Sequence, residues 1–247
     1  VPSKFTKNEL ISLQVNKFAS SKIKVVHHGY NEEYRKISTQ GGPVSGWEDD
    51  VKIENVLKKY NVSKPYLLSI GRLEEKKNTR RIVEAFNKLR LKNKDLQLLL
   101  IGQPGHGYEM VQKEIESSKF KNDIITPGWV DNEDLPIIMN KAEVFVFPSL
   151  YEGFGIPVLE AMACGMPVVA SGGGPSATLR TATQEVGGDA CLYVDPQNVD
   201  EIAEGILKLI QDEEFRSDKI EKGLGRVGGF SWEKCARNTL DLLLQED

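Results

Sequence analysis

From residue 47 onward, short apolar runs alternate with longer stretches in which apolar and polar positions follow helical spacing. This alternation is typical of βαβ units, in which helices cover both faces of a parallel sheet. We therefore predict an α/β fold with a doubly wound, Rossmann-like parallel sheet. The predicted strands are Tyr66–Ile70, Leu96–Ile101, Ile124–Thr126, Val144–Phe147, Val168–Ala170 and Cys191–Val194.

The amphipathic stretches between these runs predict the helices. The last of them, Ser231–Gln245, has Ser231 as an N-cap and a stripe of leucines on one side. Two more helices are expected between residue 164 and this one. The others are predicted at Trp47–Tyr60, Asn78–Lys92, Tyr108–Ser118, Asn132–Lys141 and Pro157–Cys164.

The first 46 residues have a different pattern. A short helix at Thr6–Asn16 and a strand at Ile23–His27 are too little to form a domain. The polar segment Asn31–Gly46 contains several glycines and shows neither helical nor strand periodicity, which is typical of a linker. We expect a domain boundary here, with residues 1–46 as the remnant of another domain plus a linker and residues 47–247 as the main domain.

Composition narrows the classes of function. A chain of 247 residues with 40% hydrophobic content can bury a sizeable core. A net charge of −4 and a pI near 5.6 do not favour nucleic acid as a partner. The three cysteines lack metal-ligand spacing and favour a reducing, cytoplasmic location. No apolar run approaches the ~20 residues of a membrane span, which leaves peripheral contact with a membrane surface open.

The loop after the strand Val144–Phe147 carries the first candidate chemistry. Gly153 and Gly155 let a ligand approach the backbone closely, and the N–H groups of Phe154, Gly155 and Ile156 precede a helix predicted to begin at Pro157. A helix N-terminus with free N–H groups favours an anion such as a diphosphate. The alternative is an ordinary turn in which the glycines only permit tight geometry.

Two carboxylates flank this loop. Glu160 follows Glu152 by eight residues and is expected in the first turn of the helix. Carboxylates accept hydrogen bonds from vicinal hydroxyls, so one could hold a ribose and the other a pyranose with phosphates between them. Alternatively, Glu160 only complements the helix dipole and Glu152 is a solvated loop residue.

Two further loops follow predicted strands. After Tyr66–Ile70, the segment Gly71–Asn78 contains Arg72, whose fork suits phosphate oxygens, and Lys77, which supplies a point charge. A solvated turn is the alternative interpretation. After the third strand, Gly128, Trp129 and Val130 offer backbone groups and apolar surface for a base edge, although Trp129 could equally serve packing. The histidines are expected to be structural.

These motifs together resemble the group 1 (family 4) glycosyltransferases, which are retaining enzymes of the GT-B fold. The resemblance rests on Gly71-Arg72 with Lys77, on Gly128-Trp129-Val130, and on the run from Phe147 to Ala170 that contains both glutamates. It extends from Tyr66 to the end of the chain. Glu185-Val186-Gly187 and Phe230-Ser231-Trp232 belong to it as well.

The resemblance implies a role for each motif. Arg72 and Lys77 would bind the donor diphosphate, Glu152 the donor sugar and Glu160 the ribose. The backbone from Gly153 to Ile156 would contact phosphates and sugar. Neither a metal nor another cofactor is implied, and the chemistry would be stabilisation of a leaving diphosphate by cationic groups.

The resemblance also sets expectations for the whole protein. It identifies residues 47–247 as the donor-binding domain with a C-terminal crossover helix, and residues 1–46 as the end of an N-terminal acceptor domain. The expected donor is a UDP- or GDP-sugar with a slight preference for GDP-mannose. The expected acceptor is a glycan or glycolipid of polysaccharide biosynthesis, at the cytoplasmic face of the membrane. The segment Ser171–Gln184 departs from the family by its length and glycine content.

Other functions fit less well. A dinucleotide oxidoreductase needs a G-x-G-x-x-G turn that the Gly71 and Gly102 turns lack. A glycoside hydrolase uses two carboxylates but needs no anion site between them. Two alternatives stay open, namely a donor-binding module that requires a separate acceptor-domain partner and a sugar-nucleotide epimerase.

Overall fold

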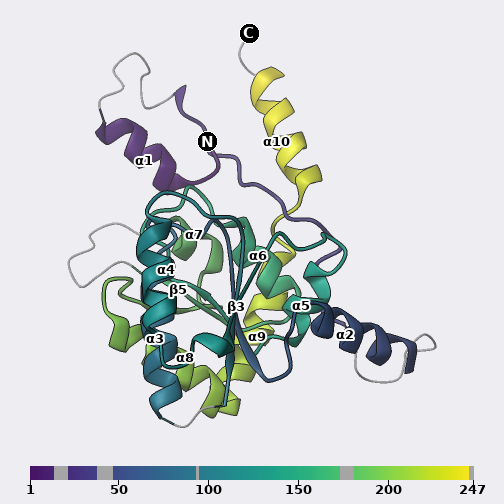
Figure 1. Ribbon diagram of the computed structural model, residues 1–247. Coiled ribbons are helices and arrows are strands. Elements are labelled where there is room, and N and C mark those ends of the chain that lie inside the picture. The colour runs from purple at the N-terminus through teal and green to yellow at the C-terminus, as the bar shows by residue number, and fades with distance from the viewer. Residues whose placement is uncertain (14–21, 38–46, 93–94, 173–180, 245–247) are drawn as a thin grey trace.

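The predicted apolar runs form one parallel six-stranded sheet in the computed structural model (Figure 1). The structure describes residues 1–13, 22–37, 47–92, 95–172 and 181–244. The strand order is β3-β2-β1-β4-β5-β6. The strands are β1 (Tyr66–Ile70), β2 (Gln97–Ile101), β3 (Ile124–Gly128), β4 (Val144–Phe147), β5 (Val168–Ser171) and β6 (Leu192–Val194).

This order confirms the doubly wound, Rossmann-like fold. The chain builds outward from β1 to β3, returns to the middle, and continues outward from β4 to β6. Leu67 pairs with Val144 and Leu68 with Phe145, so the direction of growth changes between β1 and β4. In such sheets, ligands bind beyond the carboxyl ends of the strands at this switch point.

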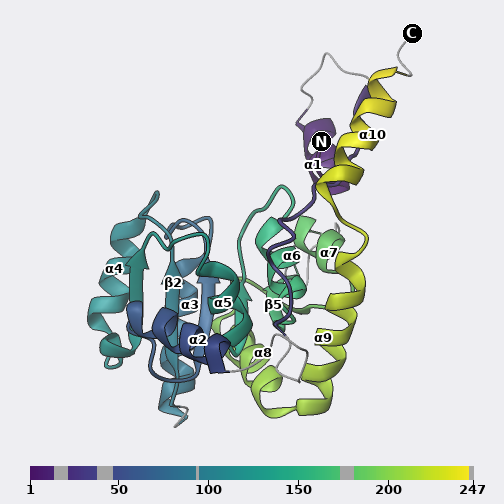
Figure 2. The same cartoon turned by 90° about the vertical axis from the view of Figure 1, so that its right-hand side faces the viewer.

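Helices cover both faces of the sheet (Figure 2). Helices α3, α4 and α8 lie on one side, and α2, α5, α6, α7 and α9 lie on the other. The helices are α1 (Lys4–Ser12), α2 (Trp47–Lys59), α3 (Thr79–Leu91), α4 (Tyr108–Ser117), α5 (Leu135–Lys141), α6 (Ile156–Ala163), α7 (Ala182–Gly187), α8 (Val199–Gln211), α9 (Glu213–Val227) and α10 (Trp232–Leu244), with a 3-10 turn at Lys121–Asp123.

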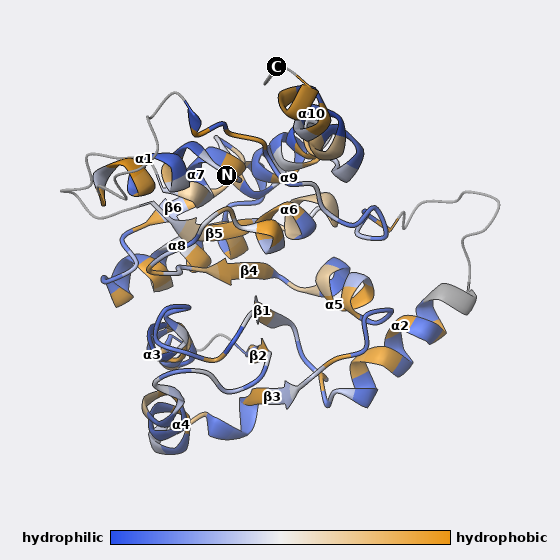
Figure 3. Ribbon diagram, turned by 90° about the horizontal axis from the view of Figure 1, so that it is seen from above, coloured by the Kyte–Doolittle hydropathy of each residue, from blue (hydrophilic) through white to orange (hydrophobic). Residues whose placement is uncertain are grey.

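Each face of the sheet has its own hydrophobic core. One core is built around Phe86, Leu98 and Ile206, which are fully buried between β1, β2, β4, α3 and α8. The other contains Phe145 and Leu159 and fills the space beneath α5, α6 and α9. The apolar positions that turn toward the sheet are visible as orange segments in Figure 3. Helices α1 and α10 contribute no buried residue to either core.

The amino-terminal segment differs from the prediction. The predicted strand Ile23–His27 is wrong, because this segment forms no strand in the described chain. Two hydrogen bonds join its backbone to the first residue. Val26 N–H donates to the Val1 carbonyl, and the Val1 amine donates to the Lys24 carbonyl, both at 2.9 Å. An apolar run without an adjacent strand stays irregular.

The helix of this region is partly confirmed, and the linker stays a prediction. Helix α1 begins at Lys4, two residues earlier than predicted, because Ser3 caps it by accepting the N–H of Thr6. Residues 14–16 of the predicted helix and 38–46 of the predicted linker lie outside the described residues, as do residues 173–180 of the glycine-rich segment. Tyr34 and Ile37 pack against the core, and the Ile37 N–H donates to Asn140 Oδ1 at 2.7 Å.

Gly102 lies at the carboxyl edge of the sheet, where two backbone segments approach each other too closely for a side chain. Gly102 follows β2 with φ +145°, and a Cβ atom there would lie 2.0 Å from the Gly71 carbonyl oxygen. Gly71 N–H donates to the Ile101 carbonyl, and Leu73 N–H donates to the Gln103 carbonyl at 3.0 Å. The loops after β1 and β2 are therefore in direct contact, and only glycine fits between them.

Candidate functional site

The loops after β1 and β4 meet at the switch point of the sheet. Leu150 N–H donates to the Lys76 carbonyl at 2.9 Å, which joins the two loops directly. Asn78, which is buried, donates to the carbonyls of Pro148 at 3.0 Å and Pro196 at 2.6 Å. Asn78 thereby ties the loop after β1 to the loops after β4 and β6.

This junction brings Lys77 and Glu152 together. The Lys77 Nζ and Glu152 Oε1 atoms are 2.5 Å apart, and the side chains are 22% and 12% exposed. The ammonium also lies 5.2 Å from the centre of the Phe147 ring. Both residues were predicted to contact a donor, and the fold places them in one charge-assisted pair.

The glycine loop presents unpaired backbone donors beside this pair. Gly155 adopts a left-handed conformation (φ 107°) and caps α6, which begins at Ile156, one residue before the predicted start. Within the described chain, the N–H groups of Gly153, Phe154, Gly155 and Ile156 donate no hydrogen bond. Free N–H groups at the positive end of a helix form a site for an anion.

Glu160 lies apart from the Lys77–Glu152 pair. It occupies the second turn of α6 rather than the predicted first turn, and no hydrogen bond or ion pair joins its carboxylate to any described residue. Burial raises the pKa of Glu160 to about 7. Its charge also contributes to raising the pKa values of Tyr34 and Cys164, so it faces the segment that precedes α2. A hydroxyl-rich ligand would supply the donors that this carboxylate lacks.

The remaining predicted residues lie along the same edge of the sheet. Arg72 is exposed and forms no ion pair within the described residues, so its guanidinium is available to a ligand. Gly71, directly after β1, and Gly128, the last residue of β3, both have positive φ. Trp129 is 76% exposed, whereas the side chain of Val130 is buried in the core. Val130 can therefore offer only its backbone to a ligand.

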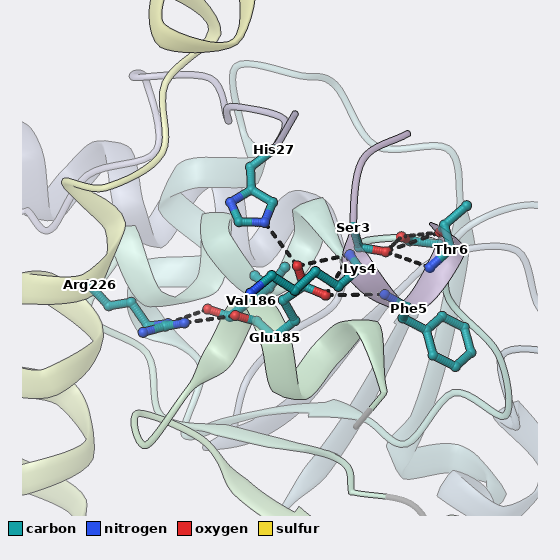
Figure 4. Close-up of polar contacts among 9 residues, drawn as sticks. Ser3, Lys4, Phe5, Thr6, His27, Glu185, Val186 and Arg226 are labelled. Atoms are coloured by element: carbon teal, nitrogen blue, oxygen red, sulfur yellow. Dashed lines mark hydrogen bonds and ion pairs between the residues drawn. The ribbon is translucent and has the colours of Figure 1, made fainter. Parts of the chain in front are cut away.

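Three residues of this region have contacts that sequence reasoning did not predict. Asn78 was interpreted as the start of a helix, whereas its left-handed backbone (φ 59°) and buried amide hold three loops together. Glu185 and His27 meet through a 2.9 Å contact between Oε1 and Nε2, although 158 residues separate them (Figure 4). No local pattern signals such a contact. For α1, the sequence offered one signal of where the helix begins, namely Ser3, a residue type that favours the N-cap.

The structure holds no ready-made metal centre in the part that it describes. No group of three or more His, Cys, Asp or Glu side chains comes together there as a metal ion would require. Among the same residues, no helix has the length and apolar character that crossing a bilayer requires.

Comparison with known proteins identifies relatives of the chain. The family described as "Glycosyl transferases group 1" matches residues 52–226. O-antigen chain mannosyltransferase B of Escherichia coli is 38% identical over 188 residues, which are 75% of this chain and 48% of that protein. The chain thus spans about half the length of this curated relative.

Solved structures share the fold. Sucrose-phosphate synthase from Thermosynechococcus elongatus has a TM-score of 0.76 at 23% identity, over 99% of this chain and 57% of that one. HepE from Anabaena, solved in complex with UDP and glucose, has a TM-score of 0.77 at 18% identity, over 97% of this chain and 60% of that one. The architecture is that of one half of a GT-B glycosyltransferase. Since the family match covers most of the sheet and both loops of the switch point, this chain belongs to the group 1 glycosyltransferases.

Proposed function

We propose that this chain is the donor-binding part of a retaining glycosyltransferase that uses a nucleoside-diphosphate sugar. One observation carries the proposal. Lys77 and Glu152 lie 2.5 Å apart at the switch point, beside the unpaired N–H groups of the loop from Gly153 to Ile156. This place combines a cation, a carboxylate and an anion-binding helix N-terminus. A sugar nucleotide suits all three, because its diphosphate would bind the cation and the helix N-terminus and its hydroxyls would bind the carboxylate.

In this proposal, the charged groups act on the leaving diphosphate. Lys77, the free guanidinium of Arg72 and the N-terminus of α6 stabilise the negative charge that develops as the bond between the anomeric carbon and the phosphate oxygen breaks. The acceptor hydroxyl oxygen forms the new bond to the anomeric carbon, and its proton passes to the departing phosphate oxygen. Glu152 accepts hydrogen bonds from sugar hydroxyls and orients the ring. No metal or other cofactor has a part in these steps.

The proposed donor is GDP-mannose, with UDP-glucose as the competing candidate. The E. coli relative is named a mannosyltransferase, and HepE was solved with UDP and glucose. The nucleoside would lie toward β3, where Gly128, Trp129 and the Val130 backbone line the edge of the sheet, and Glu160 would accept its ribose hydroxyls. We place the acceptor, a glycan or glycolipid, at the cytoplasmic face of a membrane.

A donor-binding module without transfer activity is the second candidate. It is favoured by one observation, namely that every group placed at the switch point is assigned to the donor and none to an acceptor. In that case, a partner acceptor domain would complete the enzyme.

Calorimetric titration of this chain with UDP, GDP, UDP-glucose and GDP-mannose tests both candidates. The expected result is selective binding of one nucleotide and tighter binding of its sugar conjugate. Lys77→Ala should weaken every diphosphate ligand, whereas Lys119→Ala, on the exposed turn before the 3-10 helix, should change nothing. Binding with hydrolysis of the donor supports the transferase, and binding without turnover supports the module. No binding to any of the four ligands contradicts the proposed function.

A further inference from the structure

Two hydroxyl groups of α1 converge on the glycine loop (Figure 4). Ser3 Oγ lies 2.7 Å and Thr6 Oγ1 2.9 Å from the carbonyl oxygen of Gly153, and both donate to it. The two hydroxyl oxygens are 3.0 Å apart. About 150 residues of chain separate these groups from the loop, so the contact belongs to the tertiary fold rather than to the local turn.

Glu185 holds the start of α1 in this place. Its carboxylate accepts the N–H of Lys4 at 2.8 and 3.0 Å and that of Phe5 at 3.3 Å, and it contacts His27 Nε2 at 2.9 Å. An anion at a helix N-terminus satisfies free N–H groups and complements the helix dipole. The Glu185 carbonyl in turn accepts from Arg226 at 2.7 Å. These contacts fix α1 against α7, and Arg226 in turn joins α7 to α9.

The Gly153 carbonyl is a sensitive point of the loop. Glycine has wide backbone freedom, so a loop that contains Gly153 and Gly155 needs outside contacts to keep one conformation. A peptide unit is planar and trans, so holding the Gly153 carbonyl toward α1 directs the Phe154 N–H the opposite way. The same contact anchors the chain one residue after Glu152.

We propose that Ser3, Thr6 and Glu185 are positioning residues for the donor sugar. They hold the Gly153 peptide so that the Glu152 carboxylate and the Phe154 N–H keep the geometry that the sugar requires. This inference rests on the proposed function, since it concerns the same loop. It adds that the segment before the linker controls sugar recognition, while the nucleoside binds through residues outside this loop.

The first test compares Thr6→Val with the wild-type chain. Valine keeps the shape of threonine and removes the hydroxyl. Thr6→Ser should restore the contact, and Ser12→Ala is the control because the Ser12 hydroxyl bonds only within α1, to the Glu9 carbonyl. Titration gives the ratio of affinities for the nucleoside diphosphate and its sugar conjugate. Thr6→Val should reduce the advantage of the conjugate by about two- to tenfold, the effect of one hydrogen bond, with a smaller change in affinity for the diphosphate itself.

The second test needs no ligand. NMR order parameters of the Phe154 and Gly155 amides should fall in Thr6→Val relative to wild type, while those in β4 stay unchanged. Equal order parameters, or an equal affinity ratio, would overturn the positioning role. A wild-type chain that binds no nucleotide contradicts the proposed function, and the NMR experiment still decides whether α1 holds the loop.

Discussion

Lys77 and Glu152 neutralise each other at the point where a diphosphate is proposed to bind. The pair is largely shielded from water, so its charges are only weakly screened by salt. A diphosphate must compete with Glu152 for the Lys77 ammonium. The sugar compensates by giving the carboxylate hydroxyl donors in place of the ammonium.

This competition predicts opposite effects of Glu152→Gln on two ligands. Affinity for the free nucleoside diphosphate should rise, by about two- to tenfold, because Lys77 is released and a like charge is removed. The additional affinity contributed by the sugar should fall. Calorimetry on both ligands measures this. Glu143→Gln is the matched control, since Glu143 precedes β4 at the opposite edge of the sheet, near Arg216. A parallel loss for both ligands would contradict the separate role of Glu152.

Glu160 predicts a pH dependence of donor binding. Burial raises its pKa to about 7, so about a tenth of the side chains are ionised at pH 6 and about nine tenths at pH 8. The ionised form is the better acceptor of ribose hydroxyls, so affinity for the donor should increase by up to about tenfold over this range.

Titrations with a nucleotide sugar test this prediction. Its phosphates are diesters, whereas the terminal phosphate of UDP or GDP has its own pKa near 6 and would obscure the effect. In Glu160→Gln, affinity for the donor should not change with pH and should stay near the low wild-type value at pH 6. A wild-type profile that is already flat between pH 6 and 8 would exclude ribose binding by an ionising Glu160.

At the scale of elements, contact between the loops after β1 and β2 shapes the carboxyl edge of the sheet. Gly102→Ala should destabilise the protein by about 2 kcal/mol or more, because the new Cβ would lie 2.0 Å from the Gly71 carbonyl oxygen at a φ that alanine disfavours. Gly225→Ala in α9 is the control. Its Cβ would meet nothing within 4 Å, and alanine favours helix, so stability should stay equal or rise by up to about 1 kcal/mol. Urea unfolding compares the two variants, and equal midpoints would contradict the close approach.

The elements also show what the sequence could reveal. The predicted bounds of β1 and β4 match the structure, because these buried runs end at polar or glycine-containing turns. The predicted strand Ile23–His27 had the same apolar signal but no neighbouring strand to pair with. A local sequence pattern does not show whether such a neighbour exists. Helix α7 depends on a capping box of Thr181 and Gln184 and is too short for periodicity to reveal.

Within the proposed site, the sequence predicted the groups but not their arrangement. The spacing of Glu152 and Glu160 suggested that both carboxylates line one anion site. The fold instead pairs Glu152 with Lys77, while burial and the neighbourhood of Tyr34 set the environment of Glu160. The link from Thr6 to Gly153 joins distant parts of the chain, and only a tertiary structure brings them together.

At the scale of the whole molecule, stability and the orientation of the glycine loop come from different parts of the chain. Both hydrophobic cores lie against the sheet, and neither contains a buried residue of α1 or α10, which project from the same end of the molecule (Figures 1 and 2). Leu240, Leu243 and Leu244 of α10 are 54%, 68% and 70% exposed. The sheet should therefore fold without most of α10.

Truncation after Cys235 tests this separation. The shortened chain keeps Trp232, whose ring lies 5.3 Å from that of His28, and loses the exposed leucines. Its melting temperature should stay within about 2 °C of the full chain, because less than about 1 kcal/mol of packing is removed. Phe230→Ala should instead lower the melting temperature by about 4 °C or more, since Phe230 packs against the core and against Phe154. If truncation were the more damaging change, α10 would be part of the folding unit, and the domain would extend beyond the sheet and its two covering layers.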